Sequence, residues 1–465
     1  MTPSPSRRSI LRSLVGGSLM MPAILSEVAR ADAGLPSAAA ADPLMPRPTH
    51  FAPKAKRVIF LFMTGGVSHV DSFDHKPRLI ADAGKSVPTK SGRGGSFLKA
   101  PSFDFKRRGQ SGRMVSDLFP HVGAVADDLC VVNSMYGDHG NHFEATLGIH
   151  TGSVSFTRPS IGSWISYGLG TLNQNLPSFV VLAPQLPYAG GQVWGCDFLP
   201  ACHQGTRVIP GPEPIPAMHR RAATQDLQDL ELGLLGQLNR KHLTTRGGAD
   251  PELAARIRSF ETAAGMQAQA PEAFDLSGET DATLALYGMQ RGQTKGFGWQ
   301  CLVARRLAER GVRFIELIDV GASSNWDSHG DMKAHVPLAR NVDQPIAGLL
   351  RDLKSRGMLD DTLVVWTTEF GRTPMIATKD GKGREHHAQC FTSWIAGGGA
   401  KPGTAYGSSD DYGILPATDP VHVHDFHATI LALLGLDHER LTFRHAGRDF
   451  RLTDVAGKVV KGMMA

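Results

Sequence analysis

Short runs of apolar, often β-branched residues recur along the chain and are separated by stretches with helical spacing. A continuous apolar run of about 4–8 residues is typical of a strand that is buried on both faces of a sheet. We therefore expect buried strands at residues 57–63, 129–132, 179–182, 313–318, 362–367 and 391–396.

Amphipathic helices are predicted between these strands. Residues 297–310, 342–356 and 425–434 have apolar positions at helical spacing, and each stretch is followed by a glycine, which favours a helix end. The alternation of strand and helix predicts an α/β fold with a mostly parallel sheet and helices on both faces. Residues 218–293 are polar and helix-prone, so we expect a helical insertion packed beside the sheet within a single domain at 56–465.

The N-terminal pattern is that of an export signal. Residues 6–12 (SRRSILR) resemble a twin-arginine signal, and the apolar stretch at 14–25 is too short to span a bilayer. We expect a signal peptide at 1–31, a linker rich in Ala and Pro at 32–55, and a periplasmic or extracellular protein. The alternative is an ordinary basic helix. No later apolar run approaches 18 residues, so no transmembrane helix is predicted.

Composition adds little to this picture. The chain has 465 residues, of which 41% are hydrophobic and 20% are charged, as in ordinary globular proteins. Arginines 7, 8, 12 and 30 against Glu27 supply +3 of the net charge of +5, so the rest of the chain carries +2. This near-neutral remainder gives little support for nucleic-acid binding. The five cysteines have no CxxC spacing, which disfavours a thiolate zinc cluster, while a Cys196–Cys202 disulfide stays open.

Carboxylates and histidines gather after several predicted strands. A lone loop Asp usually caps a turn, but four such segments at strand ends together favour a divalent metal ion (Zn, Mn, Mg or Ca), because ligands of α/β proteins bind beyond the carboxyl ends of strands. The candidate ligands are Asp71, Asp327, His329, Glu369, His386 and His387.

A further histidine-rich segment, DHGNHFEAT, follows the strand at 129–132. Its apolar spacing predicts a helix that starts near His142, and the free N–H groups of such a helix start attract anions. The alternative is a helix whose histidines only cap or pack.

Longer motifs carry a family resemblance. They are GGVSHVDSFDHKP, RPSIGSWISYGLG, FGWQCLVARRLAERGVRFIEL, LLRDLKSRGMLDDTLVVWTTEFGRTP, WIAGGGAKPGTAYGSSDDYG and the segment that begins PVHVHDFHATILALLGLD. The chain resembles the domain-of-unknown-function family 1501, a set of exported, sulfatase-like proteins in the alkaline phosphatase superfamily. The resemblance implies that superfamily's fold and leaves the reaction largely undefined.

The superfamily resemblance also assigns positions within the candidate site. In TLVVWTTEFG, Glu369 stands where sulfatases have a metal-binding Asp, and Phe370 stands where they have a His, so a single metal is an open alternative. The end of the sulfatase nucleophile loop resembles Ile149 to Gly152, which puts His142 near the nucleophile position. No Cys lies in this loop, so formylglycine chemistry is not expected.

These assignments define the functional hypothesis. The chain is expected to be a metal-dependent hydrolase of sulfate or phosphate esters, small or polysaccharide. His142 would be the acceptor or the acid–base group, or a metal-bound hydroxide would attack directly. His139 is a second catalytic candidate with a smaller expected effect, and Arg372 either clamps the anion or forms a structural ion pair. The alternative is a non-catalytic binding or scaffold protein. The substrate and the oligomeric state stay open.

The signal assignment predicts that changing Arg7 and Arg8 together to Lys leaves the protein in the cytoplasm, because twin-arginine export recognises that pair. Fractionation of cells that express the full chain measures this. Normal periplasmic delivery of the double-Lys variant would reject the assignment.

Overall fold

The structure is a computed structural model of the chain and describes residues 42–87, 96–216, 218, 222–246 and 250–465. The predicted signal peptide (1–31) and residues 32–41 of the predicted linker lie outside the described residues. Of the described residues, 222–246 and 250–257 belong to one compact unit of the chain, and residues 42–87, 96–216, 218 and 258–465 belong to a second, larger unit.

A nine-stranded sheet forms the centre of the larger unit. Its strand order is β15-β6-β14-β10-β1-β9-β7-β8, with β18 also paired to β6. All neighbouring pairs are parallel except the two that β14 makes with β10 and β6. The bounds are β1 Arg57–Phe62, β6 Leu129–Tyr136, β7 Phe179–Leu182, β8 Thr206–Val208, β9 Phe314–Ile318, β10 Thr362–Thr367, β14 Phe391–Ala396, β15 Thr404–Tyr406 and β18 Val421–His422.

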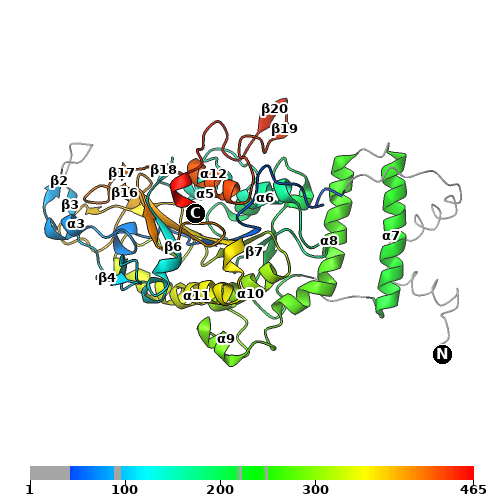
Figure 1. The fold of residues 1–465 in the computed structure, drawn as a ribbon, viewed down its shortest axis with the longest axis horizontal. Coiled ribbons are helices and arrows are strands. Elements are labelled where there is room, and N and C mark those ends of the chain that lie inside the picture. The colour runs from blue at the N-terminus through cyan, green and yellow to red at the C-terminus, as the bar shows by residue number, and fades with distance from the viewer. Residues whose placement is uncertain (1–41, 88–95, 217, 219–221, 247–249) are drawn as a thin grey trace. The chain divides into compact units, whose positions relative to one another are not determined.

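Alternate residues of the central strands build two cores, one on each face of the sheet. In β1, Ile59 and Leu61 belong to one buried cluster, whereas Phe60 and Phe62 belong to the other. The first core packs against α10 Phe297–Glu309 and α11 His335–Ser355, and the second packs against α6 Ile161–Leu169 and α12 Val423–Leu433. Figure 1 shows these two pairs of helices on opposite sides of the sheet. The predicted α/β class, with a mostly parallel sheet and helices on both faces, is confirmed.

Local sequence sets the helix boundaries. Helix α5, His142–Thr151, ends at Gly152, which adopts a left-handed φ of 69°. Helix α12 begins with a cap in which the His422 side chain accepts from the His424 N–H group at 3.2 Å and the Asp425 carboxylate accepts from the His422 N–H group at 3.1 Å. Helix α11 begins seven residues before the predicted start, because its first turns are anchored by the buried polar side chain of His335 rather than by apolar residues.

The insertion predicted at 218–293 is helical. It contains α7 Gln225–Thr245, α8 Pro251–Phe274 and α9 Asp281–Leu286. No residue of α7 is buried, and Thr224 caps its start by accepting a hydrogen bond from the Leu227 N–H group. In the larger unit, Ala270, Ala273 and Leu284 from α8 and α9 belong to the first core.

Short strand pairs complete the fold outside the central sheet. They are β2 Ser86–Val87, β3 Ser96–Leu98 and β12 Met375–Ile376 in one sheet, with two-stranded pairs of β4 Phe105–Arg108 with β5 Arg113–Ser116, β11 Gly371–Arg372 with β13 His386–His387, β16 Ser408–Ser409 with β17 Pro416–Thr418, and β19 Phe443–His445 with β20 Arg448–Phe450. Two brief helices complete the element list: α3 Pro77–Ala81 precedes β2, and α4 Pro120–Gly123 follows β5.

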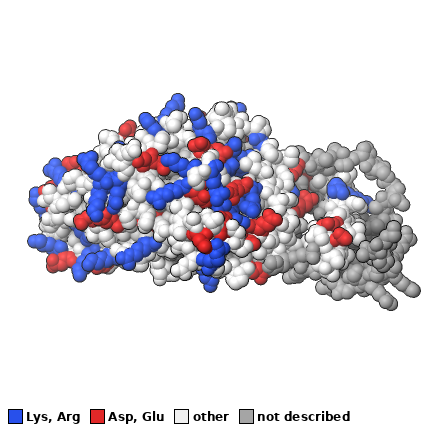
Figure 2. Space-filling view, turned by 60° about the horizontal axis from the view of Figure 1, so that its bottom comes forward, with Lys and Arg blue, Asp and Glu red and all other residues white. Residues whose placement is uncertain are grey.

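The surface charge, the cysteines and the apolar character of the helices can each be described briefly. Figure 2 shows basic and acidic side chains interspersed on the face it presents. Cys196 and Cys202 are both free thiols. Among the described residues, no helix combines the length and the apolar character that crossing a bilayer would need.

A buried ion pair ties the segment after β1 to a distant loop. The Arg384 Nε donates to the Asp71 carboxylate at 2.6 Å, and neither side chain is exposed. The same carboxylate accepts from the Ser68 hydroxyl at 2.5 Å and from the Ser102 N–H group at 2.6 Å. Burial alone would raise the pKa of Asp71, but Arg384 outweighs it and lowers that pKa to about 2.

This pair predicts an acid-sensitive fold. A group whose pKa is depressed in the folded state stabilises above its unfolded pKa, so this stabilisation is lost as the pH falls from about 4 to about 2. At pH 7, Asp71→Asn should lower the free energy of unfolding by about 3–5 kcal/mol, because Arg384 then stays buried without its counter-charge. Urea denaturation at several pH values measures both effects.

The matched control is Asp449→Asn, which breaks the exposed pair with Arg444 and should change stability by less than about 0.5 kcal/mol. An Asp71→Asn variant as stable as this control would show that the buried pair contributes nothing.

Candidate metal centre

The site lies where four central strands end. Strands β1, β6, β9 and β10 all run in one direction, so their carboxyl ends meet at one edge of the sheet. The segments that leave these ends are residues 63–66, 137–142, 319–329 and 368–372. Ligand sites of open α/β sheets form at this edge.

Three imidazole rings surround the carboxylate of Asp327. The Nε2 atoms of His329 and His386 lie 2.8 Å and 3.2 Å from its Oδ1 atom, and the Nε2 atom of His142 lies 3.3 Å from Oδ2. The Nε2 atoms of His329 and His386 are themselves 3.1 Å apart. We refer to these four residues as the Asp327 cluster. In His142, Asp327 and His386, one potential ligand atom from each lies within 4.8 Å of the others.

The other nitrogen of each ring is held by an oxygen. The His386 Nδ1–H group donates to the carbonyl of Gly140 at 2.8 Å. The Nδ1 atoms of His142 and His329 lie 2.7 Å from the carboxylates of Glu369 and Glu385. A carbonyl or an ionised carboxylate only accepts hydrogen bonds, so a ring that makes its Nδ1 contact carries a proton on Nδ1.

Each Nε2 atom therefore faces the Asp327 carboxylate either as an N–H group of a protonated ring or as a lone pair. A lone pair would be repelled by the carboxylate unless a metal ion lay between them. Metal-binding histidines typically donate their second N–H group to a carboxylate or a carbonyl, as all three rings do here. The Nε2 atom of His142 is also buried without a hydrogen-bond partner. The close grouping of His142, Asp327 and His386, with His329 beside it, therefore fits a divalent cation held by imidazole and carboxylate groups, a combination suited to Zn²⁺ or Mn²⁺.

The electrostatics of the cluster agree with this demand for positive charge. Burial opposes the charge on Asp327, but the neighbouring imidazoles of His142 and His386 and the charge of Arg372 hold the pKa of Asp327 well below its usual range. Burial also lowers the pKa of His142, yet the carboxylates of Asp327 and Glu369 outweigh it and raise that pKa above its usual value.

Glu369 connects the cluster to the turn after β1. Its carboxylate accepts from the Gly65 N–H group at 2.8 Å and is fully buried. Gly65 and Gly66 have φ values of +114° and +79°, and a Cβ atom on either would lie within 2.8 Å of Trp326 or Phe370 atoms. Only glycine therefore allows the turn to approach the site so closely.

Arg372 also holds Asp327, through the Oδ1 atom that His329 and His386 contact. This buried guanidinium donates to Asp327 at 2.6 Å, to the carbonyls of Gly65 and Gly66, and to the carbonyl of Arg384. These bonds use four of the five N–H groups that a guanidinium offers, which leaves at most one for a bound anion.

Aromatic rings enclose the imidazole of His142. Tyr188 stacks on it with the ring centres 4.2 Å apart, and Phe370 lies at 4.8 Å. The side chain of His142 is 8% exposed, whereas that of His329 is 42% exposed. The cluster is therefore closed on one side and open to solvent on the other.

The structure brings together some of the predicted site residues and separates others. Asp327, His329 and His386 meet as predicted, and His142 joins them as a potential ligand. Glu369 contacts His142 and not Asp327. Arg372 binds Asp327 in a structural ion pair, one of the two roles considered for it.

Besides Glu369 and Arg372, which contact members of the Asp327 cluster, three more predicted residues lie outside it. Asp71 is engaged by Arg384. The His387 Nε2–H group donates to the carbonyl of Ile414, and its ring stacks on His69. His139 is exposed and lies 3.7 Å from Glu144.

The sequence analysis missed Tyr188, Glu385 and the carbonyl of Gly140. Tyr188 follows the end of β7, so the strand-end rule applied to every parallel strand would have brought it into view.

Fold and site together define an α/β protein with a candidate metal centre formed by His142, Asp327 and His386, with His329 next to it. Residues 55–464 match the model of a family described as "Protein of unknown function (DUF1501)". The chain belongs to this family, which confirms the resemblance drawn from its motifs. No curated protein matches the chain.

Several solved structures share part of the fold. Ps i-CgsB in complex with k-i-k-neocarrahexaose is 13% identical, with a TM-score of 0.38 over 82% of this chain and 73% of that one. The sulfatase PsFucS1 from Pseudoalteromonas sp. is 12% identical, with a TM-score of 0.35 over 83% and 68%. The TAB5 alkaline phosphatase mutant His 135 Glu is 11% identical, with a TM-score of 0.34 over 83% and 99%. Similarities at this level carry no argument about the reaction.

The cluster predicts a bound divalent cation that stabilises the fold. Protein purified without chelator should retain metal, and Asp327→Asn should lose both the metal and the rise in melting temperature on adding Zn²⁺ or Mn²⁺, because a ligand that binds only the folded state stabilises it. Elemental analysis and thermal melting measure these effects.

Asp331→Asn is the matched control, since Asp331 lies in the same loop but caps a backbone N–H group. A metal-free wild type whose melting temperature ignores Zn²⁺, Mn²⁺, Mg²⁺ and Ca²⁺ would show that the cluster is not a metal site.

Proposed function

We propose that the protein is a metal-dependent hydrolase of phosphate or sulfate esters. The observation that carries the proposal is the orientation of His142, His329 and His386, whose Nδ1 atoms are tied to oxygens while their Nε2 atoms face Asp327. These four residues would hold the cation. When bound, the cation would polarise an ester oxygen and stabilise the charge that develops on it.

The protein's own side chains supply orientation. Glu369 fixes the ring of His142 through Nδ1, and Tyr188 excludes water from one face of that ring. Arg372 fixes Asp327 and, because it is fully buried, keeps one positive charge beside the cluster. Glu369 and Arg372 are thus positioning residues, since each acts through a member of the Asp327 cluster.

An anionic substrate suits this environment. Helix α5 starts at His142, and the side chain of Asn141 does not cap it. Its first N–H groups and its dipole therefore present partial positive charge beside the cluster. The exposed side of the cluster, at His329, is the side from which an ester, small or polysaccharide, would approach.

The role of His142 separates two mechanisms. If His142 were the nucleophile or the acid–base group, it would not be needed as a metal ligand. Replacing His142 would then leave metal binding unchanged. Its tethered Nδ1 atom and its Nε2 atom beside Asp327 instead favour a metal ligand. The same contacts also favour the alternative of a binding or scaffold protein. If His142 holds the metal, the position where the superfamily has its nucleophile carries no nucleophile in this chain.

The proposal predicts turnover of an aryl phosphate or an aryl sulfate by the metal-loaded protein. His142→Ala should abolish turnover and lower the metal content together, without loss of the fold. Glu369→Gln keeps an acceptor for the His142 ring but removes its charge, so it should weaken metal affinity by about 10- to 100-fold. Release of nitrophenol and metal titration followed by calorimetry measure the two quantities.

His139→Ala is the control, because His139 is exposed and outside the cluster. A His142→Ala variant that loses turnover but keeps its metal would restore the nucleophile role. A metal-loaded wild type that is inactive on a broad panel of esters would contradict hydrolysis and favour a binding protein.

A further inference from the structure

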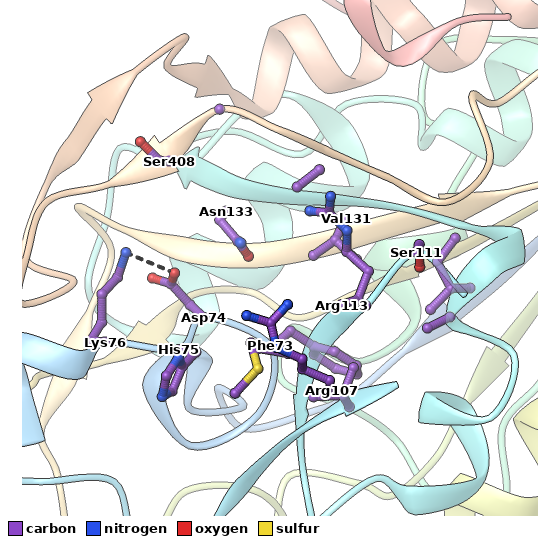
Figure 3. Close-up of a pocket in the computed structure, with 17 residues that line it drawn as sticks. Phe73, Asp74, His75, Lys76, Arg107, Ser111, Arg113, Val131, Asn133 and Ser408 are labelled. Atoms are coloured by element: carbon purple, nitrogen blue, oxygen red, sulfur yellow. Dashed lines mark ion pairs between the residues drawn. The ribbon is translucent and has the colours of Figure 1, made fainter. Parts of the chain in front are cut away.

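A separate cavity of about 470 Å³ lies beside the central sheet. Its walls come from the β4–β5 hairpin, from the segment after η1 (His69–Asp71), from β6 and from the chain near β15 and β16. None of the residues that line it belongs to the Asp327 cluster. We call it the basic cavity, for the side chains shown in Figure 3.

Two arginines at this cavity lack a counter-charge. Arg107, which is exposed, comes from β4, and the half-buried Arg113 comes from β5; among the described residues neither guanidinium has an ion pair or a side-chain hydrogen bond. The Nε atom of Arg113 is buried without a partner. Figure 3 shows both arginine side chains among the residues that line the cavity. A buried guanidinium N–H group without an acceptor is costly, and a ligand would supply the acceptor.

Asp74, the acidic residue that lines the cavity, is already paired. The Asp74 carboxylate pairs with the Lys76 ammonium at 2.9 Å and accepts a hydrogen bond from the Ser409 hydroxyl. Asp74 and Lys76 therefore cancel, and Arg107 and Arg113 leave the lining with an excess of two positive charges. A bound dianion would balance this charge.

The rest of the lining suits a compact organic body. Phe73, Val115, Leu129 and Val131 supply apolar surface. The Asn133 amide oxygen accepts from the Thr392 hydroxyl, which leaves its NH₂ group for a ligand. The volume is in the range of small-molecule sites, which combine apolar walls with a few placed polar groups.

We propose that the basic cavity binds a small phosphate monoester, with the phosphate on Arg107 and Arg113 and the organic body on the apolar wall. Near neutral pH a phosphate monoester carries close to two negative charges, whereas a sulfate monoester carries one. Guanidinium groups also match the geometry of phosphate oxygens. This site is independent of the proposed hydrolase function, because it shares no residue with the Asp327 cluster.

Calorimetric titration of the full chain with glucose 6-phosphate tests the proposal. Glucose 6-phosphate should bind more tightly than inorganic phosphate, which lacks the organic body, and than glucose 6-sulfate, which has one charge less. Glucose should not bind. The double variant Arg107→Gln and Arg113→Gln should weaken binding roughly 100-fold.

Two control variants locate the site. Arg440→Gln removes an exposed arginine outside the cavity and should bind as the wild type does. Asp327→Asn should also retain binding, which separates this site from the metal centre. Thermal melting checks that the arginine double variant is folded. Equal binding by the folded double variant, loss of binding in Asp327→Asn, or no binding by the wild type at millimolar ligand would each overturn the proposal.

Discussion

The convergence of three imidazole nitrogens on one carboxylate is the constraint on which the rest of the site depends. His142, His329 and His386 come from three separate segments, and each ring is fixed by its own oxygen partner. Lone pairs turned toward Asp327 would repel it if no cation or proton lay between them. Arg372 and the Gly65–Gly66 turn hold the carboxylate in place against this repulsion.

The placement of His142 depends on a second buried contact. The Nδ1–H group of His150 donates to the carbonyl of Thr146, and its Nε2 atom lies 2.7 Å from the Glu316 carboxylate. Glu316 belongs to the central strand β9, and both side chains are 1% exposed. A charged or proton-sharing pair at this depth fixes helix α5 against the sheet, and with it the helix start that carries His142.

Much of the fold was predictable from the sequence, because buried parallel strands appear as uninterrupted apolar runs. Strands β7, β10 and β14 have the predicted bounds. The strand-end rule also found Asp327, His329 and His386. It failed to separate His386 from His387, because neighbouring residues of a strand point to opposite faces and β13 consists of these two residues. Asp71 follows a buried strand, as a metal ligand would, but it pairs with Arg384, which is 313 residues away in the sequence. A pairing over that distance cannot be predicted from the residues around Asp71.

X-ray absorption spectroscopy of the Zn²⁺- or Mn²⁺-loaded protein tests the central claim most directly. If the Asp327 cluster holds the cation, the spectrum should show scattering from three imidazole rings and from a carboxylate oxygen bound to the metal. In His386→Ala the number of bound imidazoles should fall by one. A spectrum of oxygen ligands alone, or one that His386→Ala leaves unchanged, would contradict the claim.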